Sequence, residues 1–341
     1  MSKQQSGYPP YVKTLGYGAQ STEIPGDILG ARTCAFALDI VDPARLQATC
    51  DHFLSDPTDG AVKYKVLGKT IFMTFMHAQK LTSGSQAIGW VPDHEAAFWV
   101  PLIAKGPHGK GARLVFWMPF INISVPEGMV TGREVWGFRK QVGETVVADF
   151  AAHPMTFSTS ANVYDPMDRN TEGRIEPLAT VTGPGEQGGL SAIWSDIESA
   201  IRGFADLWTE GSGVLQTHDL GLVWNILQDA LKAEVEIVNL KQFRDAHDST
   251  RACYQALIEG PCRVHKIRGG GLLPDGFKAT IPNWQSHQIP HHLGLPLTGE
   301  LPVRFGVWVD MDFSADAGRE IWKANQVVRR NWFQKLFGLG R

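Results

Sequence analysis

The feature that most constrains this fold is a series of short strand-like runs between residues 69 and 164. The runs are rich in β-branched and aromatic residues and are separated by turns that contain glycine or proline. A parallel sheet needs a crossover of about a dozen residues or more between strands, usually a helix, and most of these gaps are too short for one. The pattern therefore predicts a largely antiparallel sheet or barrel. The runs cover 69–77, 98–103, 113–120, 145–149 and 155–164.

Further elements are predicted on both sides of these strands. Asp42 followed by Pro43 is a typical helix start, because aspartate caps the first turn and proline suits the first helical position, so a helix is expected over 43–54. Strand patterns return in the C-terminal third, and a final helix is predicted from about Ala315 onward. These later strand patterns cover 234–240, 253–259, 263–267 and 302–312.

The middle of the chain differs from the strand-rich parts. Residues 171–190 are rich in glycine, proline and threonine and are predicted to form a loop. Apolar residues at helical spacing then predict one helix from Ser191 and another over 218–233. We therefore expect a single α+β domain over 1–341 that carries a helical insertion at 176–235.

The end of the chain, residues 323–341, has a basic amphipathic pattern with no acidic side chain. Such a segment is suited to a membrane surface or to the face of a neighbouring subunit. We expect no membrane partner.

Composition excludes several functional classes. The net charge of -3, from 32 basic and 35 acidic residues, gives no electrostatic footprint for nucleic acid. No apolar run reaches the roughly 18 residues of a membrane helix, and the first twenty residues lack the apolar core of a secretory signal. The four cysteines form no C-x-x-C pair and are expected to be buried thiols, so a cytoplasmic location is predicted. No metal or cofactor motif is recognised, and we expect neither.

One segment carries a candidate for chemistry, Gly132 to Gln141, in which Lys140 follows an apolar and aromatic run. Burial disfavours the charged form of a lysine and favours the neutral amine. A neutral amine attacks a ketone or aldehyde to give an imine, which then accepts electrons released at the adjacent carbon. The ordinary alternative is an exposed lysine at the end of a strand.

The same segment resembles the G-R-E-x-x-G-[YF]-P-K-K signature of the acetoacetate decarboxylase family. Two further landmarks match in order: Arg32 stands fourteen residues before Leu46, and Glu95 six residues before Pro101. The resemblance implies a cone or barrel fold and a Schiff base at Lys140. It also implies that Arg32 binds a substrate carboxylate and that Glu95 moves protons.

The chain departs from the family pattern at two positions. Gln141 stands where the second lysine of the signature is expected, and Phe72 stands where some members have a carboxylate. With Trp136 and Phe138, these residues are predicted to contact the substrate together with Arg32. Loss of the second lysine favours imine chemistry other than decarboxylation. The resemblance therefore predicts a lysine Schiff-base lyase. Because its relatives are oligomers, it also favours a homo-oligomer in which the basic segment 323–341 contacts a neighbouring subunit.

The predicted reaction is that of an aldolase-dehydratase, which joins a small keto acid such as pyruvate to an aldehyde with loss of water. A decarboxylase of acetoacetate or another β-keto acid is the alternative within this chemistry. A non-catalytic keto-acid-binding protein is the alternative from another class.

Overall fold

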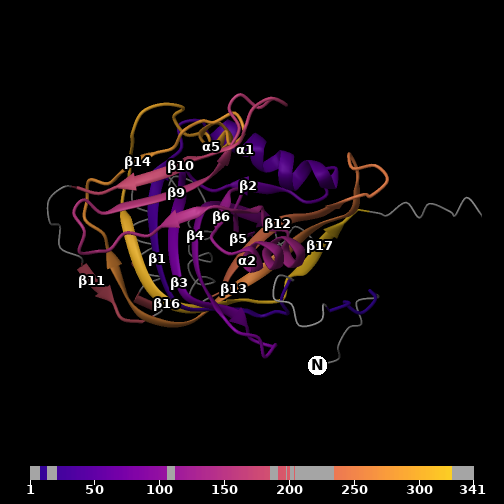
Figure 1. Ribbon diagram of the computed structural model, residues 1–341, viewed down its shortest axis with the longest axis horizontal. Helices are drawn as coiled ribbons and strands as arrows, with labels where there is room; N and C mark the ends of the chain where they lie inside the picture. Colours follow the sequence, from indigo (N-terminus) through magenta and orange to yellow (C-terminus); the bar gives the residue numbers. More distant parts are fainter. Residues whose placement is uncertain are drawn as a thin grey trace, which may run out of the picture.

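Two β-sheets form the framework of the described part of the chain in the computed structural model (Figure 1). The structure describes residues 8–13, 21–105, 112–184, 191–196, 198–199, 203 and 234–324. Within these residues the larger sheet has 12 strands and the smaller sheet has 5.

The larger sheet curls round and closes on itself. Its strands follow the order β3, β1, β16, β13, β12, β5 and β4, and β4 pairs back with β3, so that these strands form a barrel. Neighbours in the ring are antiparallel, except β12 and β5, which are parallel. The predicted α+β fold, with a mostly antiparallel sheet curled into a cone or barrel, is confirmed. The ring consists of β1 (Gly26–Asp39), β3 (Thr70–Ser83), β4 (Val91–Lys105), β5 (Ala112–Trp117), β12 (Glu234–Arg244), β13 (Ala252–Leu272) and β16 (Gly306–Ala315).

Shorter strands are attached to this ring. β6 pairs with β4, and β7 then adds in parallel to β6. β2 also pairs with β4, while β11 and β17 pair with the long strand β13. Their bounds are Tyr64–Val66 for β2, Ile121–Ile123 for β6, Lys140–Val142 for β7, Ser191–Trp194 for β11 and Arg319–Lys323 for β17.

The smaller sheet packs against the outer face of the barrel. Phe36 of β1 lies at the centre of this contact, with ring centroids 5.0 Å from Phe157 of the smaller sheet and 6.1 Å from Phe75 of β3. All three side chains are fully buried. The main apolar core therefore lies between the two sheets and leaves the interior of the barrel as a separate space. The smaller sheet consists of β8 (Glu144–Val146), β9 (Thr156–Val163), β10 (Arg174–Thr182), β14 (Lys278–Thr280) and β15 (Leu301–Pro302).

Among the described residues, three α-helices lie beside the sheets: α1 (Pro43–Cys50), α2 (Pro126–Thr131) and α5 (Ile289–Leu293). The side chain of Asp42 accepts a hydrogen bond from the backbone N–H of Arg45 at 2.9 Å, which caps the first turn of α1. A π-helical turn continues α1 to Ser55. The helix predicted over 43–54 is therefore confirmed.

Three other local predictions are wrong. The predicted loop at 171–190 contains strand β10, whose Ala179 and Val181 are fully buried. The helix predicted from Ser191 begins instead as strand β11, and the helix predicted from Ala315 gives way to strand β17. All three segments pair with strands that are distant in sequence, β10 with β14 and both β11 and β17 with β13, and this pairing outweighs the local sequence signals.

Most of the predicted insertion at 176–235, including the helix at 218–233, lies outside the described residues. At its two ends the described parts are strands, β10 and β12. The basic amphipathic pattern at 323–341 also lies outside the described residues from residue 325 onward. The assignment of 1–341 to a single domain stays a prediction.

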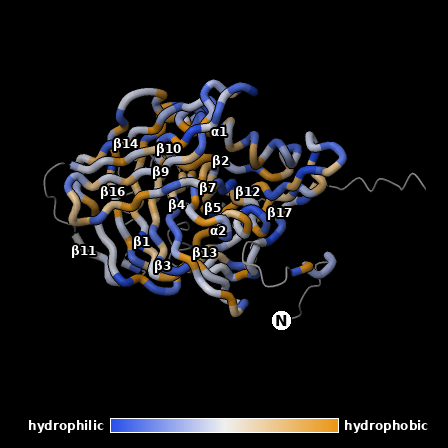
Figure 2. The backbone as a smooth tube through the Cα atoms, viewed as in Figure 1, coloured by the Kyte–Doolittle hydropathy of each residue, from blue (hydrophilic) through white to orange (hydrophobic). Residues whose placement is uncertain are grey.

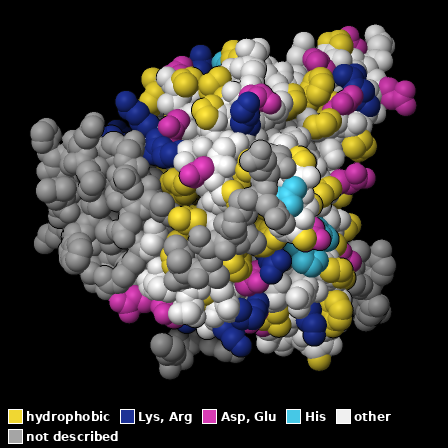
Figure 3. Space-filling view, turned by 90° about the vertical axis from the view of Figure 1, so that its left-hand side faces the viewer, with side chains coloured by type: hydrophobic (Ala, Val, Ile, Leu, Met, Phe, Trp, Pro, Cys, Tyr) yellow, Lys and Arg dark blue, Asp and Glu magenta, His cyan; other side chains and the backbone are white. Residues whose placement is uncertain are grey.

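Apolar and polar residues occupy different parts of the described chain. Hydrophobic residues gather along the central strands, and hydrophilic residues concentrate in the outer turns (Figure 2). On the face shown in Figure 3, basic and acidic side chains are interspersed among the described residues. Cys34 and Cys50 are buried as expected, whereas Cys253 is exposed. Across the described ranges, no helix is long and apolar enough to span a bilayer.

Candidate active site

The interior of the barrel holds a cavity of about 370 Å³. Every strand of the ring except β5 contributes side chains to it, and so do α2 and the signature segment. Most of the lining is apolar. The polar side chains in the lining are Thr22, Thr33, Thr74, Thr82, Asp93, Glu95, Glu127, Thr131, Lys140 and Cys262.

Two glycines allow the signature segment to enter this cavity. Gly137 ends a π-helical turn with φ of 80°, and a Cβ there would lie 2.5 Å from the Cα of Lys241. That combination of positive φ and close approach requires glycine. A Cβ on Gly132 would lie 2.9 Å from Cδ of Lys140, so this glycine makes room for the lysine side chain. Arg133 donates a hydrogen bond to the Lys140 carbonyl at 3.2 Å and so fixes the start of strand β7.

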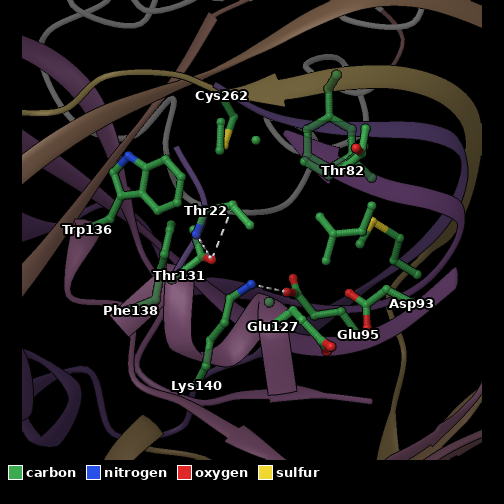
Figure 4. A pocket seen from close by; sticks show the side chains of 18 of the residues that line it. Thr22, Thr82, Asp93, Glu95, Glu127, Thr131, Trp136, Phe138, Lys140 and Cys262 are labelled. Atoms are coloured by element: carbon green, nitrogen blue, oxygen red, sulfur yellow. Dashed lines mark hydrogen bonds and ion pairs between the residues drawn. The ribbon is translucent and has the colours of Figure 1, made fainter. Parts of the chain in front are cut away.

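Strand register brings Lys140 and Glu95 together. Lys140 pairs with Ile121, and Ile121 with Ala97, which is two residues from Glu95 and so on the same face of β4. The ammonium of Lys140 donates to Oε2 of Glu95 at 2.8 Å, as Figure 4 shows. Each side chain is 14% exposed. The interior of the barrel therefore contains one nearly buried ion pair.

Asp93 is a second carboxylate on the same face of the same strand, and it is 2% exposed. The hydroxyl of Ser124 donates to it at 3.0 Å. Burial raises the pKa of Asp93 to about 6, and the charge of Glu95 adds to this rise. The site thus contains a carboxyl group that titrates close to neutral pH.

The charge state of Lys140 differs from the expected neutral amine. Burial lowers the pKa of Lys140, but Glu95, Asp93 and the hydrogen bond to Glu95 raise it, and the net effect is a raised pKa. In this arrangement Lys140 is therefore an ammonium ion. Transfer of its proton to the carboxylate 2.8 Å away would leave a neutral amine.

Arg32 is not part of this cavity. On β1, Arg32 pairs with His77 and Asp310, whereas its neighbour Thr33 pairs with Met76, which in turn pairs with Glu95. Adjacent strand residues point to opposite faces, so Arg32 faces outward and Thr33 faces the cavity.

On the outer face the Arg32 guanidinium donates two hydrogen bonds of 2.8 Å to Asp310 and stacks on Phe150 at 4.7 Å. The predicted contact of Arg32 with a substrate carboxylate is therefore wrong for this arrangement. His77 and His94, on the same outer face, bond to each other at 2.9 Å.

The residues on either side of Lys140 also point away from the cavity. Gln141 donates to Asn122 at 2.6 Å and accepts from His287 at 3.0 Å, inside a polar network on the opposite face. Arg139 stacks on Phe53 at 4.1 Å. The predicted substrate contact of Gln141 is therefore wrong, and a lysine in its place would not face the Lys140 amine.

The aromatic candidates divide into two groups. Trp136 and Phe138 line the cavity, and the Phe138 ring centroid lies 5.5 Å from Nζ of Lys140. The Trp136 indole donates to the carbonyl of Asp316 at 2.8 Å, which fixes its ring. Phe72 instead packs against Ala37 and Leu67 in a separate apolar cluster and does not line the cavity, so its substrate contact stays a prediction.

Sequence reasoning missed Asp93, Thr33 and Cys262. The signal for Asp93 was present, because Asp93 and Glu95 alternate on one predicted strand and so share a face. Burial raises the pKa of Cys262 to about 12, so its thiol stays protonated and is a poor nucleophile. Within the described parts of the chain, no three His, Cys, Asp or Glu side chains are grouped to hold a metal ion.

Comparisons with known proteins identify the fold. No family model and no curated protein matches this sequence. Among solved structures, acetoacetate decarboxylase from Legionella pneumophila matches with a TM-score of 0.57 at 12% identity, over 94% of both chains. The enduracididine biosynthesis enzyme MppR matches with a TM-score of 0.52 at 10% identity, over 88% of both chains. MppR structures complexed with pyruvate, and with the condensation product of pyruvate and imidazole 4-carboxaldehyde, match with TM-scores of 0.50 and 0.51. The chain therefore has the fold shared by acetoacetate decarboxylase and its structural relatives.

Proposed function

We propose that this protein is a lysine Schiff-base enzyme in which Lys140 forms an imine with a carbonyl substrate. The observation that carries the proposal is the Lys140–Glu95 pair at 2.8 Å, inside a mostly apolar cavity. The residue that the signature resemblance marks as the nucleophile lies against an acid-base group, at the place where a substrate would bind.

The pair supplies the proton transfers that imine formation needs. An apolar substrate that displaces water from the cavity weakens solvation of both charges, and this favours transfer of the proton from Lys140 to Glu95. The neutral amine attacks the carbonyl carbon, and the carbinolamine then loses water with a proton returned from Glu95. The positively charged iminium remains beside the Glu95 carboxylate, which stabilises it.

Glu95 then serves as the base for the next step. Its carboxylate takes a proton from the carbon next to the iminium, and the electron pair left behind forms an enamine. The enamine carbon bonds to the carbonyl carbon of an aldehyde, and the new alkoxide takes a proton. Loss of water from this adduct and hydrolysis of the iminium release the product and return Lys140. We favour this aldolase-dehydratase reaction, which is consistent with the condensation product bound to the structural relative MppR.

Borohydride trapping tests the imine directly. The protein is incubated with pyruvate and with simple ketones and aldehydes, reduced, and examined by intact mass and peptide mapping. We expect a covalent adduct on Lys140 that is lost in K140A and kept in K278A, whose lysine is exposed on the smaller sheet. An adduct of equal yield in K140A would overturn the assignment.

The two alternative functions, a decarboxylase and a keto-acid-binding protein, predict different results. A decarboxylase of β-keto acids releases CO2 from acetoacetate in a Lys140-dependent manner. A keto-acid-binding protein binds its ligand saturably but gives no reducible adduct. A cytoplasmic location and a homo-oligomeric assembly stay predictions, and gel filtration with light scattering tests the latter.

A further inference from the structure

We propose that the substrate of this cavity is a neutral, largely apolar ketone or aldehyde rather than a keto acid. The inference rests on the proposed imine chemistry and names the class of carbonyl compound that the site selects. It follows from the charges, the walls and the entrance of the cavity, and it departs from the keto acid that the sequence resemblance predicts.

The charges of the cavity oppose a substrate carboxylate. Among the described residues that line it, Lys140 is the single cation, while Asp93, Glu95 and Glu127 are acids. Imine formation converts the Lys140 amine into the iminium, which pairs with Glu95. A substrate carboxylate would then find no cation of its own and would lie near the buried Asp93, a repulsion that is strong where water is excluded.

Arg32, the arginine of β1, does not relieve that repulsion. Arg32 lies on the outer face of β1 and is held by two hydrogen bonds to Asp310. To reach the cavity, the side chain would have to pass through the sheet. An anionic substrate therefore lacks the bidentate partner that a guanidinium supplies.

The walls favour an apolar substrate. The lining also includes side chains from β3, β12, β13 and β16 that offer no hydrogen-bonding group. Apolar surface removed from water here stabilises binding by about 25 cal/mol per Å². These wall residues are Met76, Val235, Ile237, Val264, Met311 and Phe313.

One neutral polar group in the wall lacks a hydrogen bond. Among the described residues, the buried hydroxyl oxygen of Thr33 has no partner. Its side chain lines the cavity. A hydroxyl accommodates a neutral oxygen of a substrate, such as a second carbonyl or an alcohol, without needing a charge.

The entrance is apolar as well. Ile88 and Trp90, in the turn between β3 and β4, line the cavity and are 47% and 55% exposed. Lys80 lies outside this turn with its Nζ 5.0 Å from the Trp90 ring centroid. An aliphatic or aromatic tail extending from the carbonyl group would therefore run along Ile88 and Trp90 toward solvent.

The test uses matched neutral and anionic carbonyl compounds with the full chain. Octan-2-one, 2-oxooctanoate, butan-2-one and pyruvate are each titrated in the borohydride assay, and half-maximal labelling of Lys140 is normalised to labelling of a model lysine peptide. We expect octan-2-one to label at a concentration about tenfold or more below that of 2-oxooctanoate, a difference of about 1.4 kcal/mol or more. Equal or better labelling by 2-oxooctanoate overturns the inference, whereas no labelling of Lys140 by any compound overturns the proposed function itself.

A surface variant separates tail recognition from imine chemistry. I88D places a charge at the entrance on an exposed side chain, and L297D places one at an exposed site that does not line the cavity. We expect I88D to weaken labelling by octan-2-one about tenfold more than labelling by butan-2-one. L297D should alter neither. An I88D variant that labels with octan-2-one as the wild type does would contradict the entrance assignment.

Discussion

The two faces of the barrel wall each carry an ion pair, and the two pairs have the same N–O distance but different exposure to solvent. On the outer face, Arg32 and Asp310 meet at 2.8 Å with side-chain exposures of 42% and 25%. On the inner face, Lys140 and Glu95 meet at 2.8 Å with exposures of 14% each. Water screens the outer pair, which leaves it a modest structural contact. The outer pair is bidentate and contains a guanidinium, which does not give up its proton. The inner pair has a single hydrogen bond, joins a lysine to a carboxylate and is poorly solvated, so it is the pair suited to proton transfer.

The largest expected effect comes from removing the inner carboxylate. In E95Q, burial and Asp93 remain as the main influences on Lys140, so the Lys140 pKa falls and imine formation extends to lower pH. Turnover should nevertheless fall by about 100-fold to 10,000-fold, because no base takes the proton next to the iminium.

The matched outer variant D310N should change neither the pH dependence of imine formation nor turnover. Trapping rates measured from pH 5 to 9 and steady-state turnover, on both variants, check this pair of outcomes. Wild-type turnover in E95Q would show that Glu95 is not the base.

A second variant tests whether the inner pair depends on its packing. In G132A the new methyl group would lie 2.9 Å from Cδ and 3.0 Å from Cε of Lys140. The lysine must shift, and a displacement of about 1 Å costs roughly 100-fold in rate. Turnover and circular dichroism are measured together. Unchanged turnover would mean that the lysine side chain is not fixed by Gly132.

The buried Asp93 predicts an opposite dependence of stability on pH from that of an exposed carboxylate. Its pKa is raised from 3.8 to about 6, so the folded state binds this proton more tightly than the unfolded state. The stability that it contributes is fully present below about pH 4 and is lost as the pH rises through 6. D93N cannot ionise and keeps an acceptor for Ser124.

We therefore expect little change from D93N at pH 4 and a gain of roughly 2 kcal/mol in unfolding free energy at pH 8. Urea unfolding at both pH values measures it. A variant that is less stable at pH 8 than at pH 4, relative to wild type, would contradict the raised pKa.

The smallest expected effect is on the outer pair. Because Arg32 is 42% exposed, R32M should keep most of the stacking on Phe150 and change the unfolding free energy by less than about 1 kcal/mol. Turnover should remain within about twofold of wild type. A large fall in turnover, with the unfolding free energy unchanged, would show that Arg32 takes part in the reaction. The functional contrast between the outer and inner ion pairs would then be wrong.

Local sequence determined several features of this protein. The Asp42–Pro43 cap and the strand character of 69–77 depend on residues close together in the chain, whereas the choice of Lys140 as the candidate nucleophile depended on the family resemblance of its segment. Gly132 and Gly137 belong to the same local segment, and the structure gives each a steric reason. Patterns of this kind are readable because turns, caps and alternation act over a few residues.

Tertiary structure alone decided which side chains share the cavity. Thr33 faces inward and Arg32 outward because of the register between β1 and β3, and a shift of one residue would exchange them. The pairing of Lys140 with Glu95, and the strands at 174–182 and 191–194, likewise depend on contacts between distant segments. Some residues of the site could therefore be predicted from the sequence. The surroundings that fix their charge could not, because burial and strand register are properties of the packed strands.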